Sequence, residues 1–343
     1  MGRESTLLQL LRWTPDELFY RDYYYADDAG KQALLQRADP ALTAPEYVLH
    51  PERFPANETE DSFFSTGRNV SLVQHDRYQP VFLHDHAFFE MLYVVVGECT
   101  QVLAGSERRF VQGDLCLLAP GVTHGVKVLD DSVVLNILIR TSTFMDIFLN
   151  AVRDKSSLSA FFLGSMYDNR KLPYLTYHTG DDEILRDYIL TMIAEQRTAD
   201  RFSDRIICSL LTIFFAELTR GHSDDLELPA EAVKASPYGE ELMSYVISHY
   251  ATVTLNDLAE ALHFSVPYCS KLVKEACGLP FSELITRIRM QQGMNLLQTT
   301  QMSVADISAH VGYKNPETFI RCFHRCFHQT PSQYRRGGWT EEQ

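Results

Sequence analysis

The pattern of hydrophobic and polar positions changes several times along the 343-residue chain. Short helical stretches at 7–11 and 31–37 are followed by a segment that prolines break into loops. Between about residues 63 and 140, short apolar runs alternate with glycine and proline turn signals, which predicts the strands of a sandwich or barrel. From about 143 to 220, apolar residues recur at helical spacing.

Residues 221–237 form a polar, acidic stretch between a glycine and a proline, which is typical of a linker. About 100 residues with a dense helical pattern follow it. The chain is therefore expected to be a multidomain α+β protein. We predict an N-terminal helical and loop extension (1–60), a β-barrel (61–140), a helical region (141–222), the linker (223–237), an all-α domain (238–337) and a short tail (338–343).

The last hundred residues contain an internal repeat. Thr254–Phe264 aligns with Ser303–Tyr313 at an offset of 49 residues, and each copy begins with a hydroxyl residue followed three positions later by an acid, as a capped helix does. A turn containing proline and a second helix with basic residues follow each copy at an offset of 50. Two helix-turn-helix units joined by one long helix, about 281–297, could reach adjacent major-groove turns roughly 34–36 Å apart.

This segment resembles the DNA-binding domain of the AraC/XylS transcription regulators over about 100 residues. The matching residues are Asp306–Tyr313, Phe319, Arg321, Phe323, Thr330, Pro331, Tyr334 and Arg335, with Leu258, Ala259 and Gly278 in the first copy. Gly293 lies within the connecting helix, where it costs about 1 kcal/mol against alanine. It either allows close packing or softens the connector.

Helix geometry and the family correspondence together indicate which side chains face DNA. The groove-facing candidates are Val266, Pro267, Ser270 and Lys271 in the first unit, and Pro316, Glu317, Ile320 and Arg321 in the second. Lys271 and Arg321 are predicted to contact base edges, because Arg or Lys to guanine is the commonest specific pairing. Phosphate contacts are predicted for Lys274, Lys314, Arg325, Arg335 and Arg336.

The charge distribution agrees with this assignment. The whole chain carries a net charge of −14, which by itself argues against binding to phosphates. Residues 254–337, however, contain nine Lys or Arg and six Asp or Glu, so this segment is +3 and the remainder is −17. The acidic total therefore belongs to the N-terminal two-thirds of the chain.

A second group of polar residues lies in the predicted strands. His84, His86 and Glu90 have the same parity, so on one continuous strand they would share a face. With His124, after a Gly-Asp and a Pro-Gly turn, these residues resemble the two motifs of a cupin barrel, although Ala119 stands where the family usually has proline. A cupin-like sensor ahead of an AraC-type domain is a usual arrangement of this family.

Three imidazoles and a carboxylate could hold a divalent metal, as in metallocupins. Alternatively, these four residues are the polar lining of an effector pocket, or they serve strand and turn packing. No cofactor is required by the predicted function.

The resemblance implies a sequence-specific DNA-binding regulator, an activator by family behaviour, whose barrel senses a small molecule such as a carbohydrate or related metabolite. The helices of 141–222 would mediate homodimerisation and couple the effector to the DNA-binding domain, and RNA polymerase would be a further partner. This reading predicts no enzyme activity. Two alternatives stay open: a metal-dependent cupin enzyme with an auxiliary DNA-binding domain, and a constitutive DNA-binding scaffold.

The cysteines and the apolar runs bear on location. Seven cysteines are scattered along the chain, which predicts reduced thiols and a cytoplasmic protein. The most apolar run, Ile206–Ala216, falls short of the roughly 18–20 residues that span a bilayer. We therefore expect a core helix there and no membrane partner.

Overall fold

A computed structural model describes residues 3–65, 67–103, 105–144, 173–229, 238–277, 279–327 and 329–337. Gly278, residues 230–237 of the predicted linker and the predicted tail lie outside these described residues. The chain divides into two compact units, Met1–Thr141 with Pro173–Leu228, and Ser142–Leu172 with Pro229–Gln343. No helix in the described ranges is long and apolar enough to cross a membrane.

The first unit begins with a series of short helices. These are α1 (Arg3–Leu10), α2 (Pro15–Tyr25), α3 (Asp28–Arg37), α4 (Ala44–Leu49), the 3-10 turn η1 (Pro51–Arg53) and α5 (Glu60–Phe63), with the two-residue strand β1 (Asn57–Glu58) before α5. Thr14 and Glu17 cap α2 reciprocally, and Asp27 accepts a hydrogen bond from the backbone of Gly30 to cap α3.

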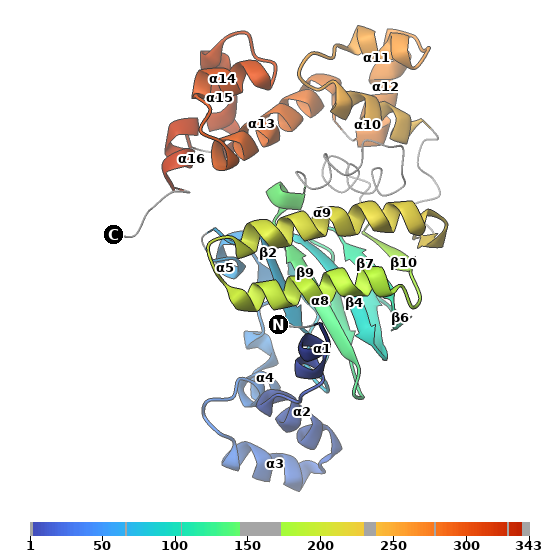
Figure 1. Cartoon of the computed structure of the whole chain (residues 1–343), viewed down its shortest axis with the longest axis vertical. Helices are drawn as coiled ribbons and strands as arrows, with labels where there is room; N and C mark the ends of the chain where they lie inside the picture. Colours follow the sequence, from blue (N-terminus) through green and yellow to red (C-terminus); the bar gives the residue numbers. More distant parts are fainter. Residues whose placement is uncertain are drawn as a thin grey trace. The chain divides into compact units, whose positions relative to one another are not determined.

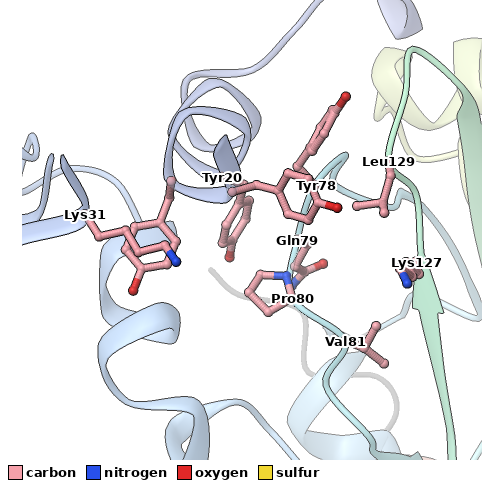
Figure 2. A pocket seen from close by; sticks show the side chains of 10 residues that line it. Tyr20, Lys31, Tyr78, Gln79, Pro80, Val81, Lys127 and Leu129 are labelled. Carbon is pink, nitrogen blue, oxygen red and sulfur yellow. The ribbon is translucent and has the colours of Figure 1, made fainter. Parts of the chain in front are cut away.

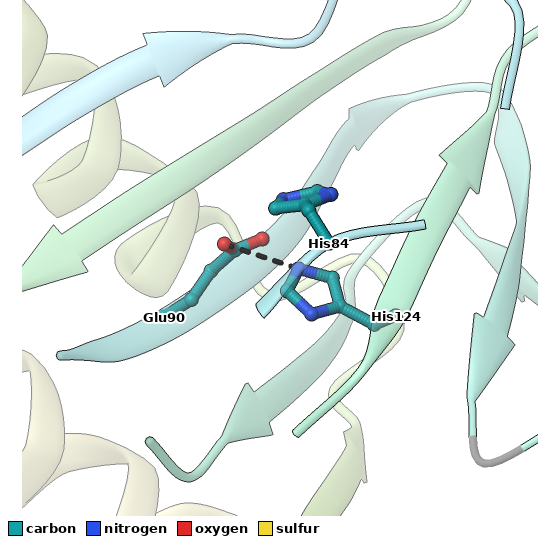
Figure 3. Close-up of side chains that lie close together, drawn as sticks. All are labelled: His84, Glu90 and His124. Atoms are coloured by element: carbon teal, nitrogen blue, oxygen red, sulfur yellow. Dashed lines mark ion pairs between the residues drawn. The ribbon is translucent and has the colours of Figure 1, made fainter. Parts of the chain in front are cut away.

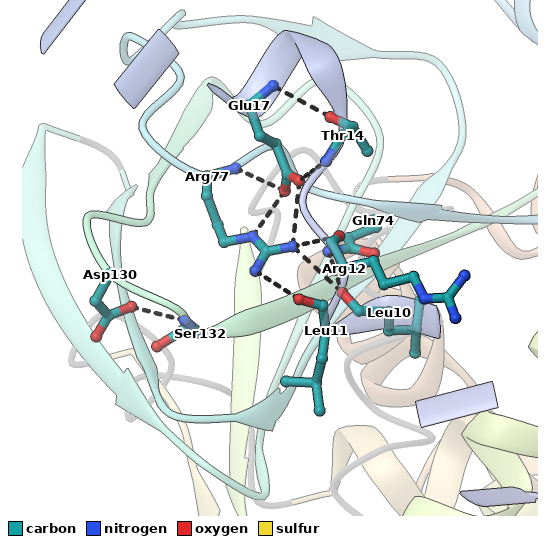
Figure 4. A network of polar contacts seen from close by, with 9 residues as sticks. All are labelled: Leu10, Leu11, Arg12, Thr14, Glu17, Gln74, Arg77, Asp130 and Ser132. Carbon is teal, nitrogen blue, oxygen red and sulfur yellow. Dashed lines mark hydrogen bonds and ion pairs between the residues drawn. The ribbon is translucent and has the colours of Figure 1, made fainter. Parts of the chain in front are cut away.

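A buried ion pair attaches these helices to the strands. The guanidinium of Arg77 is fully buried and donates to both carboxylate oxygens of Glu17 on α2, at 2.8 and 3.2 Å (Figure 4). It also donates to the backbone carbonyls of Leu10, Leu11 and Arg12. One side chain thereby satisfies the carbonyls at the end of α1 and the carboxylate at the start of α2.

In the described residues of this unit, ten more strands follow β1. They are β2 (Val70–Gln74), β3 (Asp85–His86), β4 (Phe89–Val96), β5 (Glu98–Leu103), β6 (Ser106–Val111), β7 (Asp114–Leu118), β8 (His124–Lys127), β9 (Val133–Ile139), β10 (Tyr174–His178) and β11 (Leu226–Glu227). The strand order is β11-β10-β7-β4-β9-β2 in the largest sheet, β6-β5-β8 in a second and β1-β3 in a third. All pairs in the two larger sheets are antiparallel.

Two helices cover one face of the six-stranded sheet. α8 (Glu183–Thr198) and α9 (Ser203–Gly221) pack against each other and lie across the strands (Figure 1). The amide of Gln196 hydrogen-bonds both backbone groups of Leu72 on β2, so α8 is tied to the sheet as well as packed on it. β4 and β7 are buried almost throughout, which explains why Met91–Val96 and Leu115–Leu118 are continuous apolar runs and not alternating ones.

The predicted helical region (141–222) and linker (223–237) also contribute strands. β10 pairs with β7, from Tyr174 opposite Leu118 to His178 opposite Asp114, and β11 pairs with β10. The expectation of an entirely helical region was therefore wrong at β10. In the predicted linker, Ser223–Asp225 form a 3-10 turn and Leu226–Glu227 form the edge strand β11. A five-residue strand is too short for its periodicity to distinguish it from a helix, so only the pairing partners decide.

The described residues of the second compact unit form helices joined by turns. The unit contains α10 (Gly239–Ser248), α11 (Leu255–Ala261), α12 (Val266–Cys277), α13 (Phe281–Thr299), α14 (Val304–His310), α15 (Pro316–Phe327) and α16 (Pro331–Gly337). In Figure 1, α13 runs between the group α10–α12 and the group α14–α16. Its first half, including Leu284 and Ile288, packs in one core, and its second half, including Met294 and Leu297, packs in another.

The predicted repeat is confirmed in the helix boundaries. α11 and α14 begin 49 residues apart, and α12 and α15 begin 50 apart. The side chain of Thr254 caps α11 at the backbone of Asp257, and Ser303 caps α14 at the backbone of Asp306. A hydroxyl side chain therefore caps the first helix of each helix-turn-helix unit.

Gly293 allows close packing inside the connecting helix. An ideal Cβ at this position would lie 2.7 Å from a ring carbon of Phe319 on α15. Phe319 is fully buried in the core of the second helix-turn-helix unit. Of the two explanations that the sequence leaves open, this geometry supports close packing.

Candidate DNA-binding and effector sites

The solvent face of α12 carries the side chains of the first helix-turn-helix unit that are predicted to contact DNA. Val266, Pro267, Ser270, Lys271 and Lys274 are all exposed. On the opposite face, Cys269, Leu272 and Val273 are buried in the core. The helical period thus separates a packing face from a face that is free to enter a groove.

α15, in the second helix-turn-helix unit, likewise has one packing face and one solvent face. Pro316, Glu317, Arg321 and Arg325 are exposed, and Lys314 is exposed just ahead of the helix. Ile320 is half-buried and packs partly against the core with Phe319 and Phe323. The predicted residue set therefore lies on the outer face of α15, with Ile320 at its border.

Two exposed basic side chains have weak local partners. Lys271 lies 3.5 Å from Glu275 one turn along α12, and both side chains are well exposed. Such surface pairs contribute roughly 0–1 kcal/mol, so Lys271 can leave its partner for a nucleic acid at little cost. A guanidinium nitrogen of Arg325 lies 3.8 Å from Cys322 Sγ, which is a weak acceptor.

Arg335, a predicted phosphate contact, makes hydrogen bonds inside the domain. Its guanidinium is half-buried and donates to the carbonyls of Leu297, at 3.3 Å, and Met302, at 2.7 Å. These bonds tie α16 to the end of α13. Because those N–H groups are already used inside the domain, this geometry favours a structural function for Arg335, whereas Arg336 stays exposed.

Sequence reasoning did not single out Arg289, which also supports the domain. It donates to the carbonyls of Tyr250 and Ala251, and its guanidinium lies 5.6 Å from the ring of Tyr313. These contacts join the residues that follow α10 to the turn between α14 and α15. No local pattern distinguishes such an arginine from a DNA-contacting one, because its acceptors lie 38 and 39 residues away.

The histidines of the first compact unit, Met1–Thr141 with Pro173–Leu228, meet around Glu90. His84 and His124 exchange both backbone hydrogen bonds as an isolated bridge, and their side chains lie beside the carboxylate of Glu90 from β4 (Figure 3). His86 Nε2 lies 2.9 Å and His124 Nε2 lies 3.4 Å from Glu90 Oε2. The predicted four residues therefore come together.

Their arrangement differs from the expected single strand. β3 ends at His86, and β4 begins at Phe89, so the chain bends between His86 and Glu90. His84 lies just before β3 and pairs with the start of β8. Convergence comes from pairing between separate strands and not from parity on one strand.

All three imidazoles are oriented by backbone carbonyls. Nδ1 of His84 lies 3.0 Å from the carbonyl of Phe82, Nδ1 of His86 lies 2.8 Å from that of Phe88, and Nδ1 of His124 lies 2.9 Å from that of Val122. Since a carbonyl only accepts, each Nδ1 carries the hydrogen. Nε2 of each ring is then left for other partners, as in histidines that bind metals or ligands.

The cluster separates charged from neutral groups. Burial alone would raise the pKa of Glu90, but the imidazoles of His124 and His86 outweigh it and hold that pKa well below its ordinary range. Burial works against a proton on His124, yet Glu90 raises the pKa of this imidazole. Burial and the neighbouring His124 lower the pKa of His84. The site thus holds an ionised carboxylate beside one imidazole that favours its proton and another that releases it.

The structure adds His75, which the sequence analysis missed. Its Nε2 is buried without a hydrogen-bond partner among the described atoms, and burial lowers its pKa to about 4. It follows β2 directly, and its sequence context contains no metal-binding or catalytic motif. A single histidine after a strand carries no signal, so only the tertiary structure could find it.

These groups line a cavity of about 260 Å³. The polar side chains are His75, His84, His86, Glu90, Glu58, Gln74, Asp76, Gln79 and Asn136, and the aromatic ones are Tyr47, Phe54, Phe63, Phe82 and Phe88. Aromatic walls with a few convergent polar groups are typical of small-molecule sites.

Part of the cluster also has the donors of a metal site. One ligand atom from each of His84, Glu90 and His124 lies within 4.8 Å of the other two. Two imidazoles and a carboxylate suit a divalent transition metal. His86 stands behind this group and orients Glu90 through its hydrogen bond.

Two family models match the chain over separate segments. An AraC-like ligand binding domain matches residues 71–204, which contain the cavity strands and α8. A helix-turn-helix domain matches residues 258–337, which contain α12 and α15.

Three of the similar curated proteins are named as regulators. The HTH-type transcriptional activator RhaR of Pectobacterium atrosepticum is 24% identical over 285 residues, covering 81% of this chain and 94% of that protein. The raffinose operon transcriptional regulatory protein RafR of Pediococcus pentosaceus is 31% identical over 139 residues, covering 39% and 48%. The Msm operon regulatory protein of Streptococcus mutans is 26% identical over 165 residues, covering 46% and 58%. The chain therefore combines an AraC-like ligand binding domain with a helix-turn-helix domain, which is the arrangement of a DNA-binding transcription regulator that senses a small molecule.

Proposed function

We propose that this regulator is an activator whose operator affinity responds to a small sugar or related metabolite bound in the cavity around Glu90. Sugar rings pack well on aromatic side chains, while their hydroxyls bond to imidazole, carboxylate and amide groups. The cavity offers both kinds of wall. The naming of RafR for a raffinose operon supports the same chemical class.

One observation carries the proposal. Glu90 Oε1 and His75 Nε2, which belong to residues that line the cavity, are buried without hydrogen-bond partners among the described atoms. An unsatisfied buried polar atom costs roughly 1–3 kcal/mol, so such atoms are rarely left unpaired without a reason. A ligand with several hydroxyl groups would satisfy them when bound.

The test uses the full chain and its own operator, obtained by selecting duplexes that the protein binds from a random pool. Operator affinity is then measured by fluorescence anisotropy while sugars of different size are added. We expect at least one sugar to change the affinity about tenfold, a coupling of ordinary size. In Glu90→Gln that change should disappear while basal operator binding stays, because Glu90 lies in the other unit.

Two results would contradict this function. An operator affinity that no sugar alters would favour the constitutive scaffold. A sugar response that is unchanged in Glu90→Gln would move the effector to another site.

A divalent metal is a second candidate occupant, supported by the donors on His84, Glu90 and His124. When bound there, a metal could coordinate the effector's hydroxyls. Elemental analysis of tag-free protein tests this directly, with His86→Ala and His124→Ala beside the unaltered chain. A near-stoichiometric metal that both variants lose supports a metal centre, and its absence from all three leaves the cluster as pocket lining.

We also propose a homodimer that contacts RNA polymerase. α9 exposes an apolar stripe of Phe202, Ile206 and Ile213, which lie on one side of the helix. A second copy would cover this stripe. Analytical sedimentation should show a dimer for the unaltered protein and a monomer for Ile206→Asp. In transcription with purified components, the dimer should increase the amount of transcript by recruiting RNA polymerase, and Ile206→Asp should not.

A further inference from the structure

A second cleft opens between the N-terminal helices and the strands of the ligand-binding unit. Its volume is about 360 Å³. Helices α2 and α3 supply one wall, and residues 78–81 with Lys127 and Leu129 supply the other. It shares only Gln79 and Pro80 with the lining of the cavity around Glu90.

Tyrosines form the floor of this cleft. Tyr20 and Tyr78 are buried, with exposed fractions of 2% and 9%, and Tyr23 and Tyr24 also line the cleft. The backbone of Tyr78 has a φ of 61°, a left-handed conformation that a bulky residue seldom adopts. Such strain persists only where surrounding contacts hold the residue in place.

Those contacts are aromatic. The ring of Tyr78 lies 5.9 Å from Trp13 and 5.4 Å from Tyr24, and its hydroxyl lies 3.2 Å from that of Tyr25. The floor of the cleft is therefore built before any ligand arrives.

Two lysines supply charge to the cleft. Figure 2 shows Lys31 and Lys127 on opposite sides, with Tyr20, Gln79 and Pro80 between them. Lys31 Nζ lies 5.5 Å from the ring of Tyr23. In the described part of the chain neither ammonium has an ion-pair partner, and no carboxylate is among the lining residues. Outside the lining, the carboxylates of Asp16 and Asp76 act on Tyr20, and those of Asp130 and Asp131 act on Tyr78. Two ammonium groups without ion-pair partners beside low-dielectric walls still attract anions.

From these features we propose that the cleft binds a small anionic ring compound. The ring packs on the tyrosines, and its phosphate or carboxylate accepts charge-assisted hydrogen bonds from Lys31 and Lys127. A phosphorylated sugar and an aromatic acid share this chemistry. The site is distinct from the effector cavity, so it gives the regulator a second small-molecule input.

This ligand would bridge two parts of the unit. Lys31 comes from α3, Tyr20 from α2, and Lys127 from β8. Because the bound state includes both walls, the ligand should raise the melting temperature of the protein.

The experiment follows the fluorescence of Trp13, which stacks on Tyr78. Trp339 is the second of two tryptophans, so a full-length Trp339→Phe background leaves one indole. The probes are glucose 6-phosphate and benzoate, with glucose and benzyl alcohol as their neutral counterparts. We expect an anionic probe to bind at least roughly tenfold more tightly than its neutral counterpart, and Lys31→Met and Lys127→Met each to weaken it by roughly tenfold.

Arg37→Met is the matched control, because it removes one positive charge from the same helix while Arg37 is outside the lining. Circular dichroism and melting of each lysine variant separate lost binding from lost folding. The identity of the anionic probe that binds distinguishes a phosphorylated sugar from an aromatic acid.

Several outcomes would overturn the proposal. They are no binding of either anion at millimolar concentration, equal binding of charged and neutral probes, and an Arg37→Met loss as large as that of the lysine variants. Binding that Glu90→Gln abolishes would place the probe in the other cavity. That last result would leave the proposed effector function standing and remove only the second site.

Discussion

At the scale of single residues, exposed guanidinium groups on α15 divide into two expected roles. Arg321 lies one helical turn after Glu317 on the outer face, and Arg325 lies one turn further. A base contact from Arg321 would be specific, whereas a phosphate contact from Arg325 would act on any duplex.

Arg321→Ala should therefore lower affinity for the selected operator by about 1–3 kcal/mol and relax one base position. Arg325→Ala should weaken operator and random DNA alike. Anisotropy titrations with a set of single-base operator variants measure both effects. Equal losses of Arg321→Ala on operator and random DNA would make Arg321 a phosphate contact.

Gly293 is a second residue with a defined test. Alanine would gain about 1 kcal/mol of helix propensity but force its methyl group against the buried Phe319 ring, and overpacking costs roughly 1–3 kcal/mol. We expect Gly293→Ala to lower the free energy of unfolding in urea.

Gly221→Ala is the control for Gly293→Ala. An ideal Cβ at Gly221, the last residue of α9, would meet no atom within 4 Å. If the two variants are equally stable, the Phe319 ring yields, and packing is not the reason for the glycine.

At the scale of elements, the buried pair of Arg77 and Glu17 holds the helices α1 and α2 against the strands. The Arg77 guanidinium also lies 4.5 Å from the ring of Trp13. Arg77→Met would leave the carboxylate of Glu17 buried without its partner, which costs about 3–5 kcal/mol. Urea unfolding and limited proteolysis within residues 1–60 should both register this loss.

Two further variants frame that prediction. Arg21→Met removes an exposed pair with Asp22 and should change stability little. The double variant Arg77→Met with Glu17→Gln should recover part of the loss, because no unpaired charge remains. Full stability of Arg77→Met alone would show that Glu17 reaches water instead.

A second element-scale contact depends on pH. His222, just after α9, lies 2.9 Å from Asp182, the N-cap of α8, and 2.8 Å from Asp225. Burial disfavours its proton, but hydrogen bonds to Asp182 and Asp225 outweigh this and raise its pKa above the ordinary 6.5. The charged form is thus favoured in the folded state.

The stabilisation by His222 should be complete below pH 6.5 and disappear as the pH rises through the higher folded pKa. The difference in unfolding free energy between the unaltered protein and His222→Gln should therefore shrink from mildly acidic to alkaline pH. A difference that is constant with pH would mean that the imidazole acts through packing alone.

At the scale of the whole molecule, the proposed effector cavity and the helices α12 and α15 lie in different compact units. Coupling between them requires the effector to favour one DNA-binding state over the other, and such coupling is reciprocal. Operator DNA should therefore change sugar affinity by the same factor as sugar changes operator affinity. Calorimetry with and without operator measures this factor, and unequal factors would indicate that a third equilibrium, such as dimerisation, intervenes.

Much of the DNA-binding unit could be predicted from the amino-acid order. Helix starts, the repeat and the outer faces of α12 and α15 depend on capping groups and on a 3.6-residue period, which act within a few positions. The group of His84, His86, Glu90 and His124 was also predictable, because its residue types and turn signals form a recognisable motif.

The remaining features depend on contacts between distant segments. Arg77 pairs with Glu17, which lies 60 positions earlier in the sequence. Arg335 donates hydrogen bonds to carbonyls of α13 and of the turn after it, and β10 pairs with β7. His75 joins the Glu90 cavity for the same reason. The periodicity of the sequence predicts which face of an element is apolar. A buried polar group, however, needs a hydrogen-bond partner, and that partner often lies far away in the sequence. Only the tertiary structure therefore decides which partner it has.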